Sequence, residues 1–352
     1  MKKFLALTLS LVLALSLTAC GSKTEAPADN SNTSAPSETE TPAPSTDSIT
    51  ISVCNAYSDL DQINVELKAA ADRISERTNG AVTVNVYPNN TFGDPNVWVD
   101  ATNADSPIIS VASFPTWHDM YPDADALQAG FVWESPEEII RFYDTDLCKQ
   151  IIATLDEQNI HTLNAPIAAG MRHVIGRKSY ATPEEIKGLK LRTVNGAAWL
   201  DCFTAMGASP MGMASSEQLS ALSAGTIDAL DQSISLIYST KSYELVKDVT
   251  LLAQQPLWDG LYCSTKWWNS LPADYQEIIE DELHTATVNY SNYCVENEAS
   301  MREELEAAGV VFHEADREAF AEMTKSVLDK YSISTELLET VAQIRADIAA
   351  GK

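Results

Sequence analysis

The chain has 352 residues, with 50 acidic side chains against 23 lysines and arginines, and a formal net charge of −27 at pH 7. This length is enough for two domains of ordinary size, and such an acidic chain excludes general nucleic-acid binding, which depends on clustered cations. The six cysteines form no C-x-x-C pair and no Cys/His set at zinc-ligand spacing, so we expect no metal site and mainly small buried thiols.

The first residues indicate export. Lys2 and Lys3 precede an apolar run at residues 4–17, which is too short for a permanent membrane span and has the length of a signal-peptide core. The run ends in LTACG, which resembles a bacterial lipobox and implies cleavage before Cys20 and lipidation of that cysteine. We therefore expect a signal peptide at residues 1–19 and an extracytoplasmic protein held on the membrane by acyl chains.

Residues 20–47 read as a tether. They are rich in Ser, Thr, Pro, Ala and Glu and carry almost no large apolar side chain. Such a segment cannot bury enough surface to offset its ordering entropy. Folding is expected to begin at about Ser48.

The first folded stretch alternates strands and helices, which predicts a parallel sheet. The expected order is a strand at 49–53, a helix at 59–79, a strand at 81–87, a helix at 95–103 and a strand at 108–111. Asn55, Ser113 and Trp117 follow these strands and would overhang one crevice. Trp117 is either a stacking wall for a ligand or an aromatic that packs the domain edge.

The chain then crosses into a second lobe. A helix is predicted at 136–159 and a strand at 160–165, followed by a strand at 171–177 that carries Arg172. After Thr182, which can cap a helix starting at Pro183, a strand at 189–194 carries Arg192 near its carboxyl end. Open α/β sheets bind ligands at that end. From periodicity alone, a structural salt bridge of Arg192 with Glu217 or Asp231 is the better interpretation.

The remaining elements complete both lobes. A helix is predicted at 197–206, and Ser216 is expected to cap the next one. A helix at 238–246 and strands at 249–253 and 257–264 follow, the last returning to the first lobe. A helix at 273–308 and two C-terminal helices close the chain.

The central stretch carries a family resemblance. TPEE at 182–185, GLKLR at 188–192, GASP at 207–210 and YELVK at 243–247 occur in order. They resemble the solute-binding proteins of TRAP transporters, the tripartite ATP-independent importers of organic acids. The resemblance implies an α/β fold of two lobes, like periplasmic binding proteins, with the ligand cleft between the lobes and a long helix spanning both. It also implies a monomer without a cofactor that hands its ligand to integral membrane subunits.

The same resemblance implies domain bounds and site residues. We expect lobe I at 48–169, lobe II at 170–257, the return and the long helix at 258–297, and C-terminal helices at 298–352 packing on lobe II. The strand arginine Arg192 would clamp a carboxylate, and Arg172 would add a second cationic donor. The other expected contacts are Gln232, Asn55, Asn195, Ser113, Trp117 and Ser215.

Departures from the family pattern bear on the ligand. Gln232 stands where an asparagine amide usually helps the arginine, and Ser215 stands where a phenylalanine is usual. Losing that phenylalanine opens the pocket or makes it more polar. Ser113 replaces a residue that is often acidic in sialic-acid binders, which argues against sialic acid.

Two other functions stay open from the sequence. One is a solute-binding lipoprotein of an ATP-driven importer. The other is a surface hydrolase with an unrecognised site, although the chain has no G-x-S-x-G, H-E-x-x-H or phosphate-loop motif. We therefore expect no enzyme activity.

Overall fold

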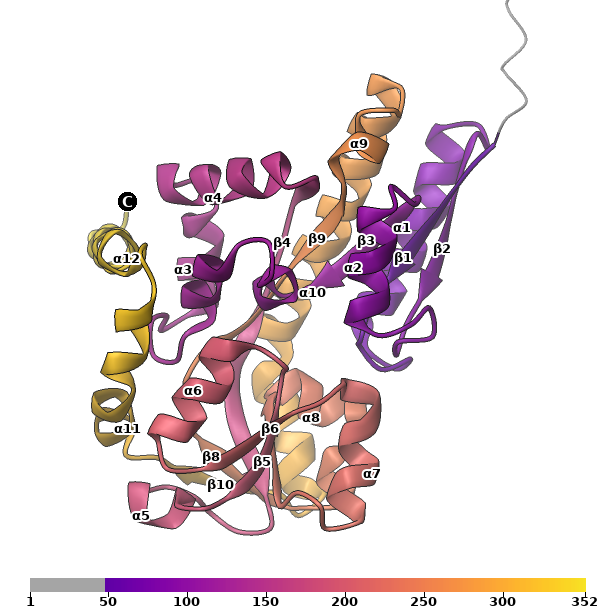
Figure 1. The fold of residues 1–352 in the computed structure, drawn as a ribbon. Helices are drawn as coiled ribbons and strands as arrows, with labels where there is room; N and C mark the ends of the chain where they lie inside the picture. Colours follow the sequence, from indigo (N-terminus) through magenta and orange to yellow (C-terminus); the bar gives the residue numbers. More distant parts are fainter. Residues whose placement is uncertain (1–47) are drawn as a thin grey trace, which may run out of the picture. The chain divides into compact units, whose positions relative to one another are not determined.

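A ten-stranded mixed sheet runs through residues 48–352, the residues that the computed structural model describes (Figure 1). The predictions of a signal peptide, a lipidated Cys20 and a tether fall outside the described residues. The strands are β1 (Ile49–Cys54), β2 (Val82–Tyr87), β3 (Ile108–Ala112), β4 (Ile160–Gly176), β5 (Lys190–Thr193), β6 (Ser209–Gly212), β7 (Ala229–Ser233), β8 (Asp248–Leu251), β9 (Pro256–Ser264) and β10 (Val311–Glu314).

The sheet consists of two parallel groups joined by antiparallel strands. The β1 group (β1, β2 and β3) is parallel throughout, and so is the β7 group (β5, β6 and β7). Strands β4 and β9 run antiparallel to their neighbours and connect the two groups, in the order β3-β9-β4-β7. The parallel arrangement predicted for the first folded stretch is confirmed in the β1 group.

The structure has one long strand, β4, where the sequence predicted two. Residues 160–165 and 171–177 were expected to be separate strands, but β4 is continuous over 17 residues. Its pairing with β9 shifts register between Leu163 and Ile167 and again between Ala168 and Met171. Gly170 lies in the second shift with φ of +88°, a conformation that glycine adopts without steric cost. The chain thus bends while remaining in the sheet.

Helices cover the sheet, and several begin at side-chain caps. The α-helices are α1 (Gln62–Arg77), α2 (Pro95–Asn103), α3 (Pro136–Phe142), α4 (Asp146–Glu157), α5 (Pro183–Ile186), α6 (Ala197–Ala205), α7 (Gln218–Ser223), α8 (Ile234–Thr240), α9 (Thr265–Trp268), α10 (Ala273–Ala307), α11 (Arg317–Thr324) and α12 (Ser334–Ala349). The 3-10 helices are η1 (Phe114–Trp117), η2 (Pro122–Gln128), η3 (Ser215–Glu217), η4 (Ser242–Glu244) and η5 (Lys325–Lys330). As expected, Thr182 caps α5, where it forms a capping box with Glu185.

Three helix predictions are wrong. The helix expected at 136–159 is two helices, because the Thr145 hydroxyl accepts from the backbone N–H of Cys148 and starts α4. The helix expected at 238–246 is α8, which ends where Lys241 takes a left-handed conformation. Ser216 caps no helix, since it lies inside η3 and α7 starts two residues later.

The long helix α10 joins two apolar cores. Near its start, Ile279 and Leu283 pack with α1 and the β1 group. Near its end, Met301 and Leu305 pack with side chains of β7, α8 and β8. The expected α/β fold class, with a long helix spanning both groups, is confirmed.

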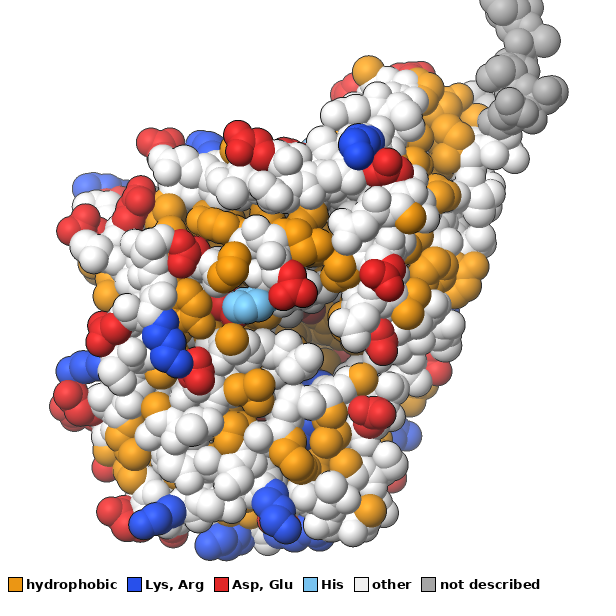
Figure 2. Space-filling model, viewed as in Figure 1, with side chains coloured by type: hydrophobic (Ala, Val, Ile, Leu, Met, Phe, Trp, Pro, Cys, Tyr) orange, Lys and Arg blue, Asp and Glu red, His pale blue; other side chains and the backbone are white. Residues whose placement is uncertain are grey.

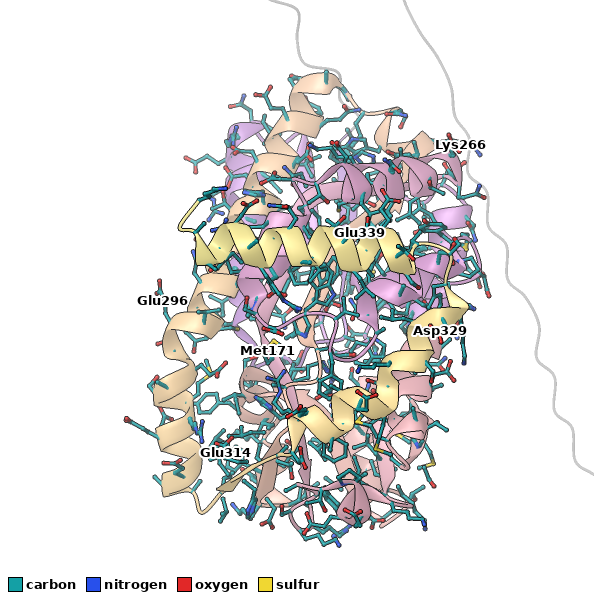
Figure 3. The ribbon with its side chains drawn as sticks, turned by 90° about the vertical axis from the view of Figure 1, so that its left-hand side faces the viewer. Met171, Lys266, Glu296, Glu314, Asp329 and Glu339 are labelled. Atoms are coloured by element: carbon teal, nitrogen blue, oxygen red, sulfur yellow. The ribbon has the colours of Figure 1, made fainter. Side chains whose placement is uncertain are left out.

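The C-terminal helices pack on two different parts of the chain. Helix α12 contacts α3 and α4, which precede residue 170, while α11 and η5 contact α6. Arg345 fixes the contact, since its guanidinium donates to the buried carboxylate of Glu138 at 2.8 Å. Figure 3 shows α12, with Glu339, lying across this side of the molecule.

The five described cysteines are all buried and unpaired, as expected of small buried side chains: Cys54, Cys148, Cys202, Cys263 and Cys294. In residues 48–352, none of the helices combines the length and the apolar composition needed to cross a bilayer.

Candidate functional site

A cavity of about 700 Å³ lies between the β1 group and the β7 group. Its wall is formed where parallel strands end: residues 56–58 follow β1, residues 113, 115, 116, 118 and 119 follow β3, residues 194–197, 199 and 200 follow β5, and residues 213–218 follow β6. The start of α2 adds residues 94–99. Figure 2 shows this face hollowed between the places that α2 and β6 occupy in Figure 1, with acidic side chains exposed beside the hollow. This volume suits a small molecule.

Arg192 reaches the cavity from the carboxyl half of β5, as the strand pattern predicted. Its side chain is 5% exposed, and Nε and Nη2 both donate to the carbonyl oxygen of Met213, at 3.1 and 2.8 Å. Its Nη1 has no acceptor among the described residues. Burial and the nearby Arg172 lower the pKa of Arg192 to about 10, so the guanidinium remains charged at neutral pH. The cavity wall therefore holds a cation that no carboxylate neutralises directly.

Arg172 also lines the cavity, but its charge is balanced. Its Nε donates to Oδ1 of Asp231 at 3.1 Å, and its Nη2 donates to the Asp231 carbonyl oxygen at 2.5 Å. The carboxylate of Asp231 also accepts from Thr193 and Gln254, at 2.8 and 2.7 Å. The structural salt bridge with Asp231 that the sequence suggested for Arg192 thus belongs to Arg172.

The guanidinium of Arg172 lies 4.7 Å from the ring centroid of Trp199, a cation–π distance. Trp199 belongs to α6 and lines the cavity, as does Trp98 of α2. These two indoles give the polar wall large apolar surfaces.

Six of the eight predicted contacts line the cavity: Arg192, Arg172, Gln232, Asn195, Ser113 and Ser215. The Gln232 amide is already engaged, since it bonds to the side chains of Gln218, Thr240 and Ser242. The Ser215 hydroxyl donates to the carbonyl oxygen of Ala56 at 2.7 Å.

Asn55 and Trp117 do not line the cavity. The Asn55 amide is buried, donates to Asn64 at 2.9 Å and accepts from the backbone N–H of Tyr57. Trp117 is fully buried, with its ring centroid 5.4 Å from that of Tyr262. Of the two roles that the sequence left open for Trp117, packing is the one observed.

Tyr57 and Asp259 are among the cavity residues that were not predicted, and they pair with each other. The Tyr57 hydroxyl donates to Oδ2 of Asp259 at 2.6 Å. Asp259 lies in the middle of β9, within the otherwise apolar run PLWDGLY. A single acid inside a buried strand was a usable signal, because an unpaired carboxylate is rare in such a place.

The two sides of the cavity touch through polar contacts. Besides Ser215 and Ala56, the Ser58 hydroxyl donates to the Ser239 carbonyl oxygen at 3.1 Å. The Ser239 hydroxyl in turn donates to the buried carboxylate of Asp61 at 2.6 Å. These bonds hold the segment after β1 against α8.

In residues 48–352, no group of three His, Cys, Asp or Glu side chains could hold a metal ion. A buried carboxyl, Asp125, faces the cavity-lining His118 at 2.8 Å. Burial raises the pKa of Asp125 to about 6, against the opposing effect of His118.

Residues 55–334 match the family described as bacterial extracellular solute-binding protein, family 7, or DctP. The chain belongs to this family. Sequence relatives of this DctP-family chain include the C4-dicarboxylate-binding periplasmic protein DctP of Vibrio cholerae, 27% identical over 76% of this chain and 82% of that protein.

Solved structures agree with this assignment. A TRAP periplasmic solute-binding protein of Fusobacterium nucleatum with bound sn-glycerol-3-phosphate is 29% identical, with a TM-score of 0.83 over 86% of this chain and 100% of that one. A second, from Actinobacillus succinogenes with bound L-galactonate, has a TM-score of 0.79 at 24% identity over 84% and 99% of the two chains. The resemblance to TRAP solute-binding proteins is thereby confirmed at the level of the family and the fold.

Proposed function

We propose that this DctP-family chain is the solute-binding component of a TRAP transporter and captures a small organic acid in the cavity between the β1 and β7 groups. The observation that carries the proposal is the buried Arg192 guanidinium, whose hydrogen bonds within residues 48–352 go only to the carbonyl oxygen of Met213. A carboxylate matches its planar set of donors, and a charge-assisted bond there adds both affinity and orientation.

The ligands of similar proteins support an anion. The Vibrio cholerae relative is named for C4-dicarboxylates, and the Fusobacterium nucleatum structure holds a glycerol phosphate. Both ligands are small and anionic, as a cation on the cavity wall requires. The two molecules differ in their remaining groups, so Arg192 accounts for the shared charge and leaves selectivity to other residues.

The proposed binding set uses both sides of the cavity. Arg192 holds the acid, Arg172 presents the remaining face of its guanidinium, and Asn195, Ser113, Gln232 and Ser215 meet the remaining polar atoms. Lobe I would span 48–169 and lobe II 170–257, with 258–297 returning to lobe I. A ligand that touches both lobes favours the closed state, because only differential contact shifts such an equilibrium.

The rest of the proposal concerns location and partners. We assign residues 1–19 to a signal peptide and Cys20 to lipidation, which would hold a monomer on the outer face of the cytoplasmic membrane. The partners are then the integral membrane subunits of the transporter. The proposal includes no turnover of the ligand.

The test is ligand-dependent stabilisation by a panel of organic acids. A ligand at 100 times its dissociation constant stabilises the native state by about 2.7 kcal/mol, which a melting curve resolves. Arg192→Lys should weaken the best ligand at least about tenfold, because lysine lacks the planar set of donors.

The matched control is Arg141→Lys, which changes a surface arginine paired with Glu137. It should leave binding unchanged. A best ligand that binds Arg192→Lys as tightly as the natural chain would refute the assignment.

A further inference from the structure

The cavity contains a carboxylate that the proposed function leaves unused, Asp259. It comes from β9, the strand that joins the two groups, and part of its side chain faces the cavity. Its Oδ2 accepts from the Tyr57 hydroxyl, while Oδ1 has no donor among the described residues. Asp259 forms no salt bridge within residues 48–352, so it does not serve as an ionic support of the fold.

The neighbouring cation, Arg172, forms its hydrogen bonds with Asp231 and not with Asp259. Arg172 is close enough to lower the pKa of Asp259, but its donors are directed at Asp231. Burial outweighs this effect and raises the pKa of Asp259 above its ordinary value. The carboxyl group is therefore costly to keep charged, and it belongs to a cavity-lining residue whose Oδ1 has no donor among the described residues.

Three kinds of ligand group could meet that oxygen. A second carboxylate would face a like charge, which disfavours it whenever Asp259 is ionised. An ammonium group pairs only with the ionised form. A hydroxyl group donates to the carboxylate and accepts from the carboxylic acid, so it suits both protonation states.

We propose that Asp259 is the specificity-determining residue of this cavity and selects hydroxyl-bearing organic anions over dicarboxylates. The inference rests on the proposed function, since Arg192 holds the anionic end of the same ligand. The cavity then presents one cation and one lone carboxylate, which suits a molecule with an acid at one end and hydroxyl groups at the other. The ligand class is hydroxy acids.

The first measurement is a set of dissociation constants by calorimetry at pH 7. The matched four-carbon probes are succinate, 4-aminobutanoate, 4-hydroxybutanoate and D-erythronate, with L-galactonate and sn-glycerol-3-phosphate as longer or phosphorylated anions. Hydroxylated anions should bind at least about tenfold more tightly than succinate and 4-aminobutanoate. A tightest ligand that is a dicarboxylate or an amino acid would overturn the inference.

The decisive variant is Asp259→Asn, which keeps the size of the side chain and an oxygen for Tyr57. The preference for hydroxylated anions over succinate should fall at least about tenfold, since a hydrogen bond to a charged group is lost and a like charge is removed. Glu339→Gln removes an exposed carboxylate on α12, away from the cavity-lining residues, and should leave the preference unchanged. An unchanged preference in Asp259→Asn would contradict the assignment.

A second variant covers the possibility that Asp259→Asn fails to fold. Tyr57→Phe removes the only described donor to Asp259 and keeps the carboxylate, so the preference should stay within about threefold. If this change abolishes the preference, recognition belongs to the tyrosine hydroxyl instead. If no acid binds the natural chain, the proposed function fails as well, whereas binding without dependence on Asp259 removes only the inference.

Discussion

Two neighbouring buried arginines, Arg172 and Arg192, differ in the groups that bind their guanidinium ions. Arg172 is held by both the carboxylate and the carbonyl oxygen of Asp231, so its charge is compensated within the protein. Among the described residues, Arg192 is held only by the carbonyl oxygen of Met213, and it keeps its charge. The charge of Arg172 therefore has a carboxylate partner in the cavity wall, whereas the charge of Arg192 has none among the described residues.

The Arg172–Asp231 pair makes a prediction about stability. Asp231→Asn leaves a guanidinium that is 2% exposed without its counter-charge, so the free energy of unfolding should fall by about 3–5 kcal/mol. Urea unfolding measures this. Asp228→Asn is the control, because its pair with Arg177 is 3.5 Å long and partly exposed, and it should cost no more than about 1 kcal/mol. An equal loss of unfolding free energy in Asp231→Asn and Asp228→Asn would show that the buried pair stabilises the fold no more than the exposed pair does.

Sequence reasoning located the arginines but not their partners. The position of Arg192 near the carboxyl end of its strand followed from local periodicity. The partner of Arg172 depends on the register of β4 against β7, which places Arg172 opposite Ser233 and brings Asp231 within reach. That register joins residues 59 positions apart, and a single sequence does not reveal it. Asp259 was missed for the same reason, since its neighbours Tyr57 and Arg172 are distant in sequence.

At the scale of helices and strands, the bounds were predicted correctly where a residue such as Pro or Gly marks the end of the element. The bounds of α10 were predicted to within one residue, because Pro272 precedes it and Gly309 follows it. Strand β4 was divided in two because Gly170 is a turn signal on its own, and only pairing with β9 keeps the strand continuous. The α3–α4 break was missed because the apolar pattern continues through it.

Gly170 makes a prediction at this scale. Gly170→Ala forces a side chain into φ of +88°, which should cost about 1–2 kcal/mol of unfolding free energy. The added Cβ would lie 3.0 Å from Oε2 of Glu298, a flexible carboxylate that can move aside. Gly309→Ala is the control, because it has the same φ of +88° and open space around it. A cost at Gly170 of more than about twice that at Gly309 would show that Glu298 is fixed in place.

For the molecule as a whole, we expect a buried histidine to contribute to the acid dependence of stability. His173 accepts from the backbone N–H of Ala253 at 3.2 Å, and burial lowers the pKa of His173 to about 3. The unfolded chain binds this proton near pH 6.5, whereas the native state does so only near pH 3. His173 therefore stabilises the native state above pH 6.5, and this contribution is lost as the pH falls towards 3.

The corresponding prediction is a slope of unfolding free energy with pH. Between pH 6 and pH 4, His173 should contribute up to about 1.4 kcal/mol per pH unit. His173→Asn supplies an acceptor that does not titrate, so urea unfolding at several pH values should show a shallower slope. The same change at the partly exposed His284 should preserve the original slope. A slope that is unaltered in His173→Asn would assign acid sensitivity to other groups.

The unpaired cysteines have a consequence for how this chain tolerates oxidants. They lie in β1, α4, α6, β9 and α10, so the buried thiols are distributed over strands and helices in different parts of the fold. Burial raises the pKa of each of these thiols, which suppresses the reactive thiolate while the chain stays folded. Residues 48–352 contain no cross-link, and an alkylating reagent can reach these five thiols only where and when the fold opens.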